Sequence, residues 1–168
     1  LAQSVEGMAL AMYLAEIAVA LSPAPPESQE HLRLLLNCLY MISEGKHPLR
    51  QIKAIYEMRA LTLSGYMPQI LACASCGKYE GGGFYLDPEE GTLLCSDCAA
   101  KVRRTPNLDT GALYALRHIC LAEDKKLFGF TLSPHSQRLL GAAVERYLLA
   151  HLEQGLKSLD FLKSVISE

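Results

Sequence analysis

The sequence has 168 residues, half of them hydrophobic, and a formal net charge of −2 at pH 7. This length suits one domain, or one domain with a small insertion. A charge so near zero argues against binding to nucleic acid or anionic membranes through overall charge. The chain starts at Leu1 without a signal-peptide pattern, which suggests that it was excised from something longer or processed.

The first predicted helix covers residues 5–21 and is apolar on nearly every side. Its only charges are Glu6 and Glu16, and it is too short and too interrupted to span a bilayer comfortably. A helix with this pattern is normally buried. We therefore expect it to be the central helix of a bundle, or to rest against a domain that has been cut away.

Further helices follow from apolar residues at helical spacing and from clear boundary signals. A proline-rich break over 22–26 precedes the second helix, and Ser133 followed by Pro134 reads as an N-cap with proline in the first turn. These helices are predicted over residues 27–43, 48–64, 109–122, 134–155 and 157–166. The expected fold is mainly α, a bundle of about six helices.

Two Cys-x-x-Cys pairs interrupt the helical pattern. Cys73 and Cys76 form the first pair, and Cys95 and Cys98 follow after eighteen residues. This is the spacing of four-cysteine zinc ribbons, in which four thiolates at about 2.3 Å close a tetrahedral coordination sphere. Thioredoxin-like redox chemistry is the rival interpretation, but it needs one pair at a strand-to-helix junction. We predict one structural zinc ion.

The segment between the two pairs predicts a β-hairpin. Residues 84–86 and 92–94 are strand-like, and the turn residues of 87–91 connect them. A ribbon this small needs metal binding for its folding free energy. We predict a single helical domain over 1–168 with the zinc ribbon inserted over 69–104.

The remaining two cysteines, Cys38 and Cys120, lie in helical patterns and are expected to be buried, inert thiols. This cysteine usage fits a reducing cytoplasm. Nothing in the sequence supports catalysis, because the five histidines are scattered and the glycine run at 81–83 lacks the lysine and hydroxyl residue of a phosphate-binding loop. We do not expect an enzyme.

Arg59 breaks the apolar pattern of the third helix. Helical periodicity places it within about 20° of Ile52, which belongs to the inward stripe. An arginine in that position must reach solvent, pair with a carboxylate or serve a ligand. Glu16 is a possible partner, and a structural pair is favoured over a binding role.

Basic residues are concentrated in two stretches, 44–59 and 101–126, where Lys and Arg outnumber Asp and Glu. Such stretches could meet phosphates or an acidic peptide, and an ordinary solvated surface is the alternative.

Several motifs occur in a characteristic order: Tyr56-Glu57 followed by Arg59 and Leu61, Gly65-Tyr66-Met67-Pro68, Cys73-Ala74-Ser75-Cys76-Gly77, Phe84, Cys95 to Cys98, and Lys157-Ser158-Leu159-Asp160-Phe161-Leu162. Taken together, they resemble the C-terminal part of RecO, the bacterial DNA repair and recombination mediator. The resemblance implies a helical domain with a zinc ribbon, single-strand annealing, assistance in recombinase loading, and partnership with RecR and the single-stranded-DNA-binding protein. RecO proteins also begin with an OB-fold, and no such run of strands precedes Val5 here.

The two basic stretches supply candidate contacts for these partners. Weak, salt-sensitive contacts with single-stranded DNA are expected from the basic residues Lys101, Arg103, Arg104, Lys125 and Lys126. The acidic, apolar-ended tail of the single-stranded-DNA-binding protein is expected beside the third helix, at Arg50, Lys53 and Arg59. The location would be cytoplasmic, at the nucleoid and not in a membrane. Two alternatives are a nucleic-acid-gripping accessory domain of a larger DNA-processing enzyme and a purely structural interaction module.

Overall fold

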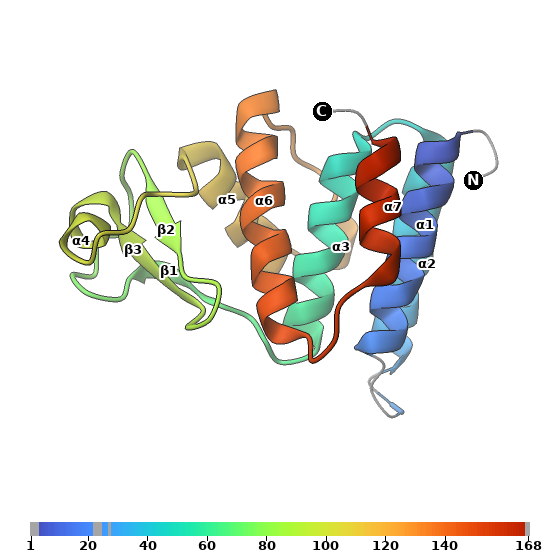
Figure 1. Cartoon of the computed structure of the whole chain (residues 1–168), viewed down its shortest axis with the longest axis horizontal. Coiled ribbons are helices and arrows are strands. Elements are labelled where there is room, and N and C mark those ends of the chain that lie inside the picture. The colour runs from blue at the N-terminus through green and yellow to red at the C-terminus, as the bar shows by residue number, and fades with distance from the viewer. Residues whose placement is uncertain (1–3, 22–24, 27, 167–168) are drawn as a thin grey trace.

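The computed structural model describes residues 4–21, 25–26 and 28–166. The α-helices of this part of the chain are α1 (Val5–Ala20), α2 (Ser28–Glu44), α3 (Leu49–Leu63), α4 (Ser96–Lys101), α5 (Thr110–Leu121), α6 (Pro134–His151) and α7 (Lys157–Val165). The strands are β1 (Gln69–Cys73), β2 (Phe84–Leu86) and β3 (Thr92–Cys95), and a 3₁₀ turn, η1, covers Asp124–Lys126. Figure 1 shows the helical body at one side of the molecule and the ribbon at the other.

The six predicted helices are present, and α5 and α6 begin at side-chain caps, of which the Ser133 cap was predicted. Ser133 Oγ accepts a hydrogen bond from the Ser136 amide at 3.1 Å at the start of α6, and Asp109 caps α5 through the Ala112 amide at 2.8 Å. The mainly α class is therefore confirmed. Three elements were not predicted from the sequence: α4, η1 and β1. Most of the predicted break at 22–26 lies outside the described residues.

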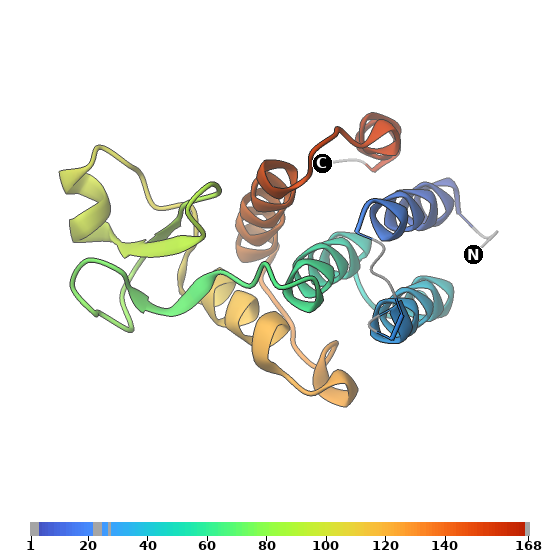
Figure 2. The ribbon, with the colours of Figure 1, turned by 90° about the horizontal axis from the view of Figure 1, so that it is seen from below.

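The central helix of the bundle is α3, so the prediction that the first helix is central is wrong. Seen from below in Figure 2, α3 lies among α1, α2, α5 and α6. α1 instead lies at the edge of the bundle, with Met8, Met12 and Val19 exposed on its outer side. α3 carries buried polar residues, Gln51 and Glu57, and each of them has a hydrogen-bond partner from another element. Buried polar residues with hydrogen-bond partners can occupy a core, which apolar patterning alone does not reveal, although Glu57 is bonded through Oε1 and its Oε2 has no hydrogen-bond partner.

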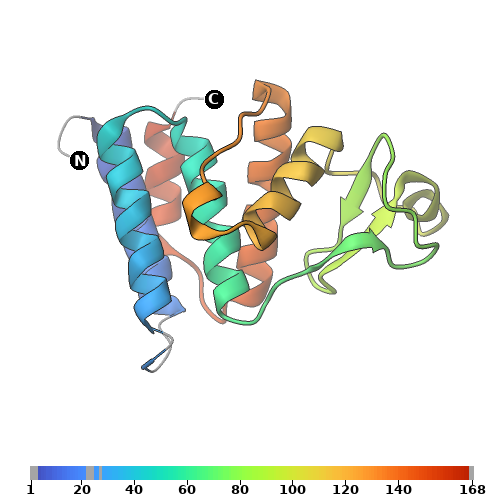
Figure 3. The same cartoon turned by 180° about the vertical axis from the view of Figure 1, so that it is seen from behind.

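The ribbon contains a three-stranded sheet in the order β1-β3-β2. β2 and β3 form the predicted antiparallel hairpin, with Phe84 opposite Cys95 and Leu86 opposite Leu93. β1 adds to β3 in parallel, with an irregularity between Gln69 and Cys73. Figure 3 shows β1 leading from the end of α3 directly into the ribbon. Buried apolar residues of the sheet continue the core of the helical body.

Within the described residues, no helix combines the length and apolar character needed to cross a membrane.

Candidate metal centre and binding grooves

The four predicted metal ligands meet in one cluster. The Sγ atoms of Cys73, Cys76, Cys95 and Cys98 all lie within 4.8 Å of one another. Cys76 Sγ and Cys95 Sγ are 3.7 Å apart. Four sulfurs at about 2.3 Å from a central ion form a tetrahedron with edges of about 3.8 Å, so this separation fits tetrahedral coordination.

Local backbone structure brings the thiols together. β1 delivers Cys73 and the following turn delivers Cys76, with Gly77 at a φ of 75° closing the turn. β3 ends at Cys95, which is the N-cap residue of α4, and Cys98 lies in the first turn of that helix. The second pair is therefore at a strand-to-helix junction, as a redox motif would be. All four thiols nevertheless converge on one point, which favours a metal over a redox pair.

The donor set suits a thiophilic cation such as Zn²⁺. Burial alone would raise the pKa of the Cys73 thiol, but hydrogen bonds from the amides of Cys95, Cys76 and Ser75 lower it to about 6. Backbone donors of this kind stabilise the thiolate, which is the form that binds metal. The four cysteines would hold the ion, and it would cross-link β1 to β3 and α4.

Arg117 docks the ribbon onto the helical body. Its side chain, on α5, donates to the carbonyls of Ile70 at 2.8 Å, Leu71 at 2.9 Å and Tyr79 at 2.8 Å. The guanidinium also lies over the Tyr79 ring, 4.1 Å from its centroid. Sequence reasoning counted Arg117 only as a surface cation. Its position among Leu116, Ile119 and Cys120 was the available signal, because a cation on a buried helix needs fixed partners.

The other two cysteines are far from this cluster in the sequence and are free thiols. Both are buried in the helical body, and burial raises the pKa of each, that of Cys120 to about 11. A buried, protonated thiol is a poor nucleophile, as expected for a core residue.

A groove of about 410 Å³ runs between α3, α6 and α7. Four basic residues line it, Arg50 and Lys53 from α3, Arg138 from α6 and Lys163 from α7. Glu145 is the acidic residue of the lining, and Leu162 and Ile166 contribute apolar surface. The groove therefore combines an excess of positive charge with apolar contact area.

An ion network forms the polar floor of this groove. Lys53 Nζ lies 2.7 Å from Glu57 Oε1 and 2.8 Å from Glu145 Oε2. Glu57 is fully buried, and Tyr13 of α1 donates to its Oε1 at 2.6 Å. Burial would lower the pKa of Lys53, but Glu57 and Glu145 raise it, so the ammonium form is favoured. Sequence reasoning missed this network because its members come from three helices, α1, α3 and α6.

Arg59 faces a different pocket, and its predicted pairing with Glu16 is wrong. Arg59 Nη2 donates to Asp124 Oδ1 at 3.0 Å, and Nη1 donates to the carbonyls of Ile119 and Cys120. It thus satisfies carbonyl groups in the last turn of α5. Glu16 instead accepts hydrogen bonds from the amides of Lys157 and Ser158, each at 2.8 Å, at the start of α7.

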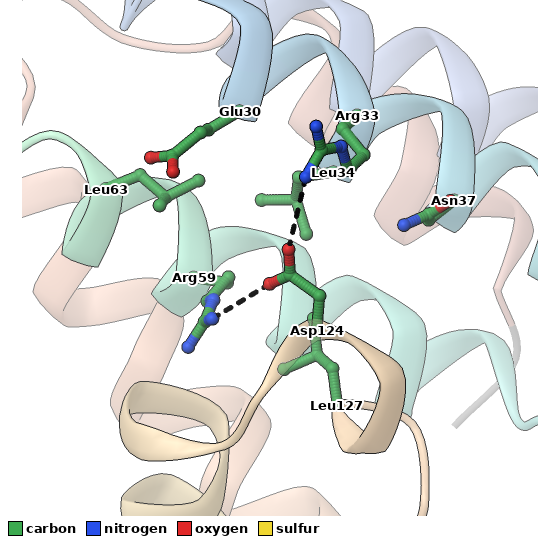
Figure 4. A pocket seen from close by; sticks show the side chains of 8 residues that line it. All are labelled: Glu30, Arg33, Leu34, Asn37, Arg59, Leu63, Asp124 and Leu127. Carbon is green, nitrogen blue, oxygen red and sulfur yellow. Dashed lines mark hydrogen bonds and ion pairs between the residues drawn. The ribbon is translucent and has the colours of Figure 1, made fainter. Parts of the chain in front are cut away.

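The Arg59 pocket is small, about 60 Å³, and lies between α2, α3 and η1. In Figure 4, Asp124 lies between Arg59 and Arg33, whose Nη1 is 3.9 Å from Asp124 Oδ2. Glu30 and Asp124 balance the two arginines, so the lining carries no excess of positive charge. Nine residues separate Arg59 from Arg50, which places them on opposite sides of α3.

The five predicted DNA-contacting residues are all exposed, and they form two separate clusters. Lys101, Arg103 and Arg104 lie at the end of α4, at the ribbon end of the molecule (Figure 1). The Arg104 guanidinium is 5.8 Å from the centroid of the Tyr85 ring. Lys125 and Lys126 lie in η1, beside the Arg59 pocket.

Fold and site together define a helical bundle that carries a four-cysteine ribbon. A model of the family described as "Recombination protein O C terminal" matches residues 2–160. The chain therefore belongs to the RecO C-terminal family.

Curated relatives support this assignment. The chain is 32% identical over 134 residues to the DNA repair protein RecO of Acetivibrio thermocellus, covering 80% of this chain and 53% of that protein. It is 34% identical over 143 residues to the DNA repair protein RecO of a Nocardioides species, covering 82% and 55%. With the corresponding protein of Symbiobacterium thermophilum, identity is 28% over 163 residues, covering 95% and 64%. The chain thus spans between about half and two thirds of these relatives.

Proposed function

We propose that this chain is the partner-binding part of a mediator of DNA repair and recombination. It acts by binding and not by catalysis, assisting single-strand annealing and recombinase loading together with RecR and the single-stranded-DNA-binding protein, in the cytoplasm at the nucleoid. The family match over residues 2–160 supports this role. So do the relatives, which carry the name DNA repair protein RecO.

The metal of the four-cysteine cluster is proposed to be one structural zinc ion. Four thiolates leave no open coordination position, so such a site stabilises the fold and does not activate a substrate. The metal-dependent unit would be the ribbon, over residues 69–104, inserted in a single helical domain that comprises the chain.

The observation that carries the partner assignment is the groove between α3, α6 and α7. An acidic peptide with apolar terminal residues needs cations for its carboxylates and apolar surface for its last side chains. Arg50 and Lys53, two of the residues predicted for this role, line the groove with Arg138 and Lys163. Arg59, the third, faces the small pocket on the other side of α3, which has no excess of positive charge. The groove is therefore the proposed site of the tail.

Peptide titration tests this site. A labelled acidic peptide ending in apolar residues is titrated into the wild-type chain and into Arg138→Ala, with Arg146→Ala as the control for lost positive charge, since Arg146 is an exposed residue of the same helix that does not line the groove. Arg138→Ala should weaken binding by roughly fivefold, about 1 kcal/mol, while Arg146→Ala should change it little.

The third arm of the titration is Arg59→Ala, with circular dichroism reporting the fold. Lost affinity at unchanged stability would move the tail site to the Arg59 pocket. Lost stability at unchanged affinity would assign Arg59 a structural role only. Unchanged affinity in all the variants would mean that the peptide binds elsewhere.

DNA contact is proposed for the two exposed basic clusters. Five residues neutralise few phosphates, so binding to single strands should be weak and its salt dependence shallow. Filter binding with an oligonucleotide, comparing Lys101→Ala/Arg103→Ala with Lys125→Ala/Lys126→Ala, reports which cluster contributes. Tight binding that persists at about 0.5 M salt, where exposed charges are screened, would instead favour the nucleic-acid-gripping accessory domain of a larger enzyme.

A further inference from the structure

One ion pair crosses the groove between α3, α6 and α7. Glu145 of α6 reaches Lys163 of α7, with 2.5 Å between Oε1 and Nζ. Its other oxygen, Oε2, lies 2.8 Å from Lys53 Nζ. A single carboxylate therefore engages two of the four cations that line the groove. Glu145 comes from the wall of the groove, and its side chain is partly exposed.

Lys53 has a second carboxyl partner besides Glu145, namely Glu57, whose pKa burial raises although Lys53 and Tyr13 act to lower it. Its Nζ also contacts Glu57, at 2.7 Å, and the side chain of Glu57 is completely buried. Tyr13 donates a hydrogen bond to the same carboxylate at 2.6 Å and holds it in place. If Glu145 moved away, Lys53 would keep one fixed carboxylate and would gain the capacity for a second one.

Lys163 likewise does not require Glu145 as a partner. Its side chain is 57% exposed, and Glu145 is the partner of its ion pair in the described part of the chain. Water or another carboxylate can replace Glu145 at so exposed an ammonium group at little cost, because exposed ion pairs contribute little net free energy. The contacts of Glu145 are thus those that a carboxylate entering from outside would make.

We propose that Glu145 is an internal occupant of the groove, and that an acidic ligand displaces it from Lys53 and Lys163. This inference rests on the proposed role of the groove as an acidic-peptide site. An incoming carboxylate takes the position of the Glu145 carboxylate, and the Glu145 side chain turns toward solvent. Glu145 then disfavours weak, singly charged anions, and a ligand with several carboxylates can compete through Arg50 and Arg138 as well.

Charge removal at Glu145 tests the competition. Glu145→Gln keeps the shape of the side chain and should raise the affinity of the full chain for a labelled acidic peptide by roughly three- to tenfold. The matched control is Glu153→Gln, which makes the same change in net charge at an exposed residue outside the groove lining. A general electrostatic effect would strengthen binding equally in both variants and would overturn the proposal.

The outcomes separate this inference from the groove assignment. Wild-type binding in the groove with no gain in Glu145→Gln overturns the internal-occupant role alone. Failure of the wild type and of Glu145→Gln to bind the peptide overturns both. If Glu145→Gln lowers the thermal midpoint, the ¹³C shift of the Glu145 carboxyl group is followed in the wild type instead. It should move with the same saturation curve as peptide binding, and a shift that stays constant through saturation would overturn the proposal.

Discussion

The ribbon and the helical body are held together by different means. In the ribbon, short strands and a six-residue helix surround four cysteines. Arg117, hydrogen bonds from Thr110 and Tyr114, and buried apolar residues of the sheet connect the ribbon to the body. In the body, α3 is packed on nearly every side, and Lys53 pairs with Glu57 of the same helix and with Glu145 of α6, while Arg59 pairs with Asp124 of η1. The ribbon therefore depends on a few strong local bonds, and the body on many weak contacts plus a buried ion network. Perturbing one region should leave the other largely intact.

The largest effect is expected from loss of the metal. Zinc binding contributes about 10–16 kcal/mol in isolated zinc-finger peptides, so Cys95→Ser should release the ion and unfold the ribbon. The helices should remain, because their contacts with one another do not depend on the thiols, although buried residues of the sheet continue their core. Elemental analysis should find about one zinc per wild-type chain, and amide exchange should increase in β1–β3 only.

A thiol outside the cluster is the control for this experiment. Cys120→Ala should retain the metal, since Cys120 lies in the helical core. Unfolding of the whole chain on zinc removal would show that the two regions are one cooperative unit. Absence of zinc from protein purified without chelator would contradict the proposed zinc site.

Breaking the ion network should destabilise the helical body and leave the metal site intact. Lys53→Met keeps the apolar stem but leaves buried Glu57 without its cation, and removing one partner of a buried pair costs about 3–5 kcal/mol. Denaturant unfolding should show this loss while the zinc content is unchanged. The double variant Lys53→Met/Glu57→Gln should recover part of it, because the uncompensated charge is gone. No recovery would mean that packing, and not charge, accounts for the loss.

The junction between the two regions depends on Arg117. Arg117→Lys keeps the charge but cannot reach three carbonyls at once, and it should cost about 1.5–3 kcal/mol, the range for hydrogen bonds to charged groups. The effect should appear as faster amide exchange in β1 with normal zinc content. Arg146→Lys, on the exposed side of α6, should have no such effect. Unchanged exchange in Arg117→Lys would assign the docking to apolar contacts.

The smallest effect is expected where α7 joins α1. Hydrogen bonds from the Ser158 side chain and amide, and from the Lys157 amide, lower the pKa of Glu16 below its ordinary value of 4.5. A lowered folded-state pKa means that the stabilisation is complete above the unfolded pKa and is lost as the pH falls through the folded pKa. Glu16→Gln should therefore cost about 1 kcal/mol at pH 7.

As the pH falls, the unfolding free energy of Glu16→Gln should decrease less than that of the wild type. The difference in unfolding free energy between them should shrink as the pH falls below 4.5, with Glu90→Gln in the ribbon turn as the control. A difference that is constant from pH 7 to pH 3 would contradict the role of the ionised carboxylate.

Arg59 and Glu16 show where prediction from the sequence ended. Both were singled out because a charge lay within an apolar pattern, and both do have structural partners. The partners themselves, Asp124 and the start of α7, are separated from them by 65 and by 141–142 residues. Helical periodicity gives the direction in which a side chain points but not which element lies there. Helical periodicity could therefore not decide whether Arg59 and Glu16 pair with each other or with residues of other elements.

Features that depend on neighbouring residues could be predicted from the sequence. Cysteine spacing predicted the four-cysteine cluster, and Ser133 located the start of α6, because coordination within each pair and capping act over three or four positions. Three features depend on tertiary contacts: α3 and not α1 is central, β1 pairs in parallel with β3, and Arg50 and Arg59 face different pockets. These features arise when segments far apart in the chain bury one another's charges and unpaired backbone groups, and the free energy of that burial depends on the partner as much as on the residue.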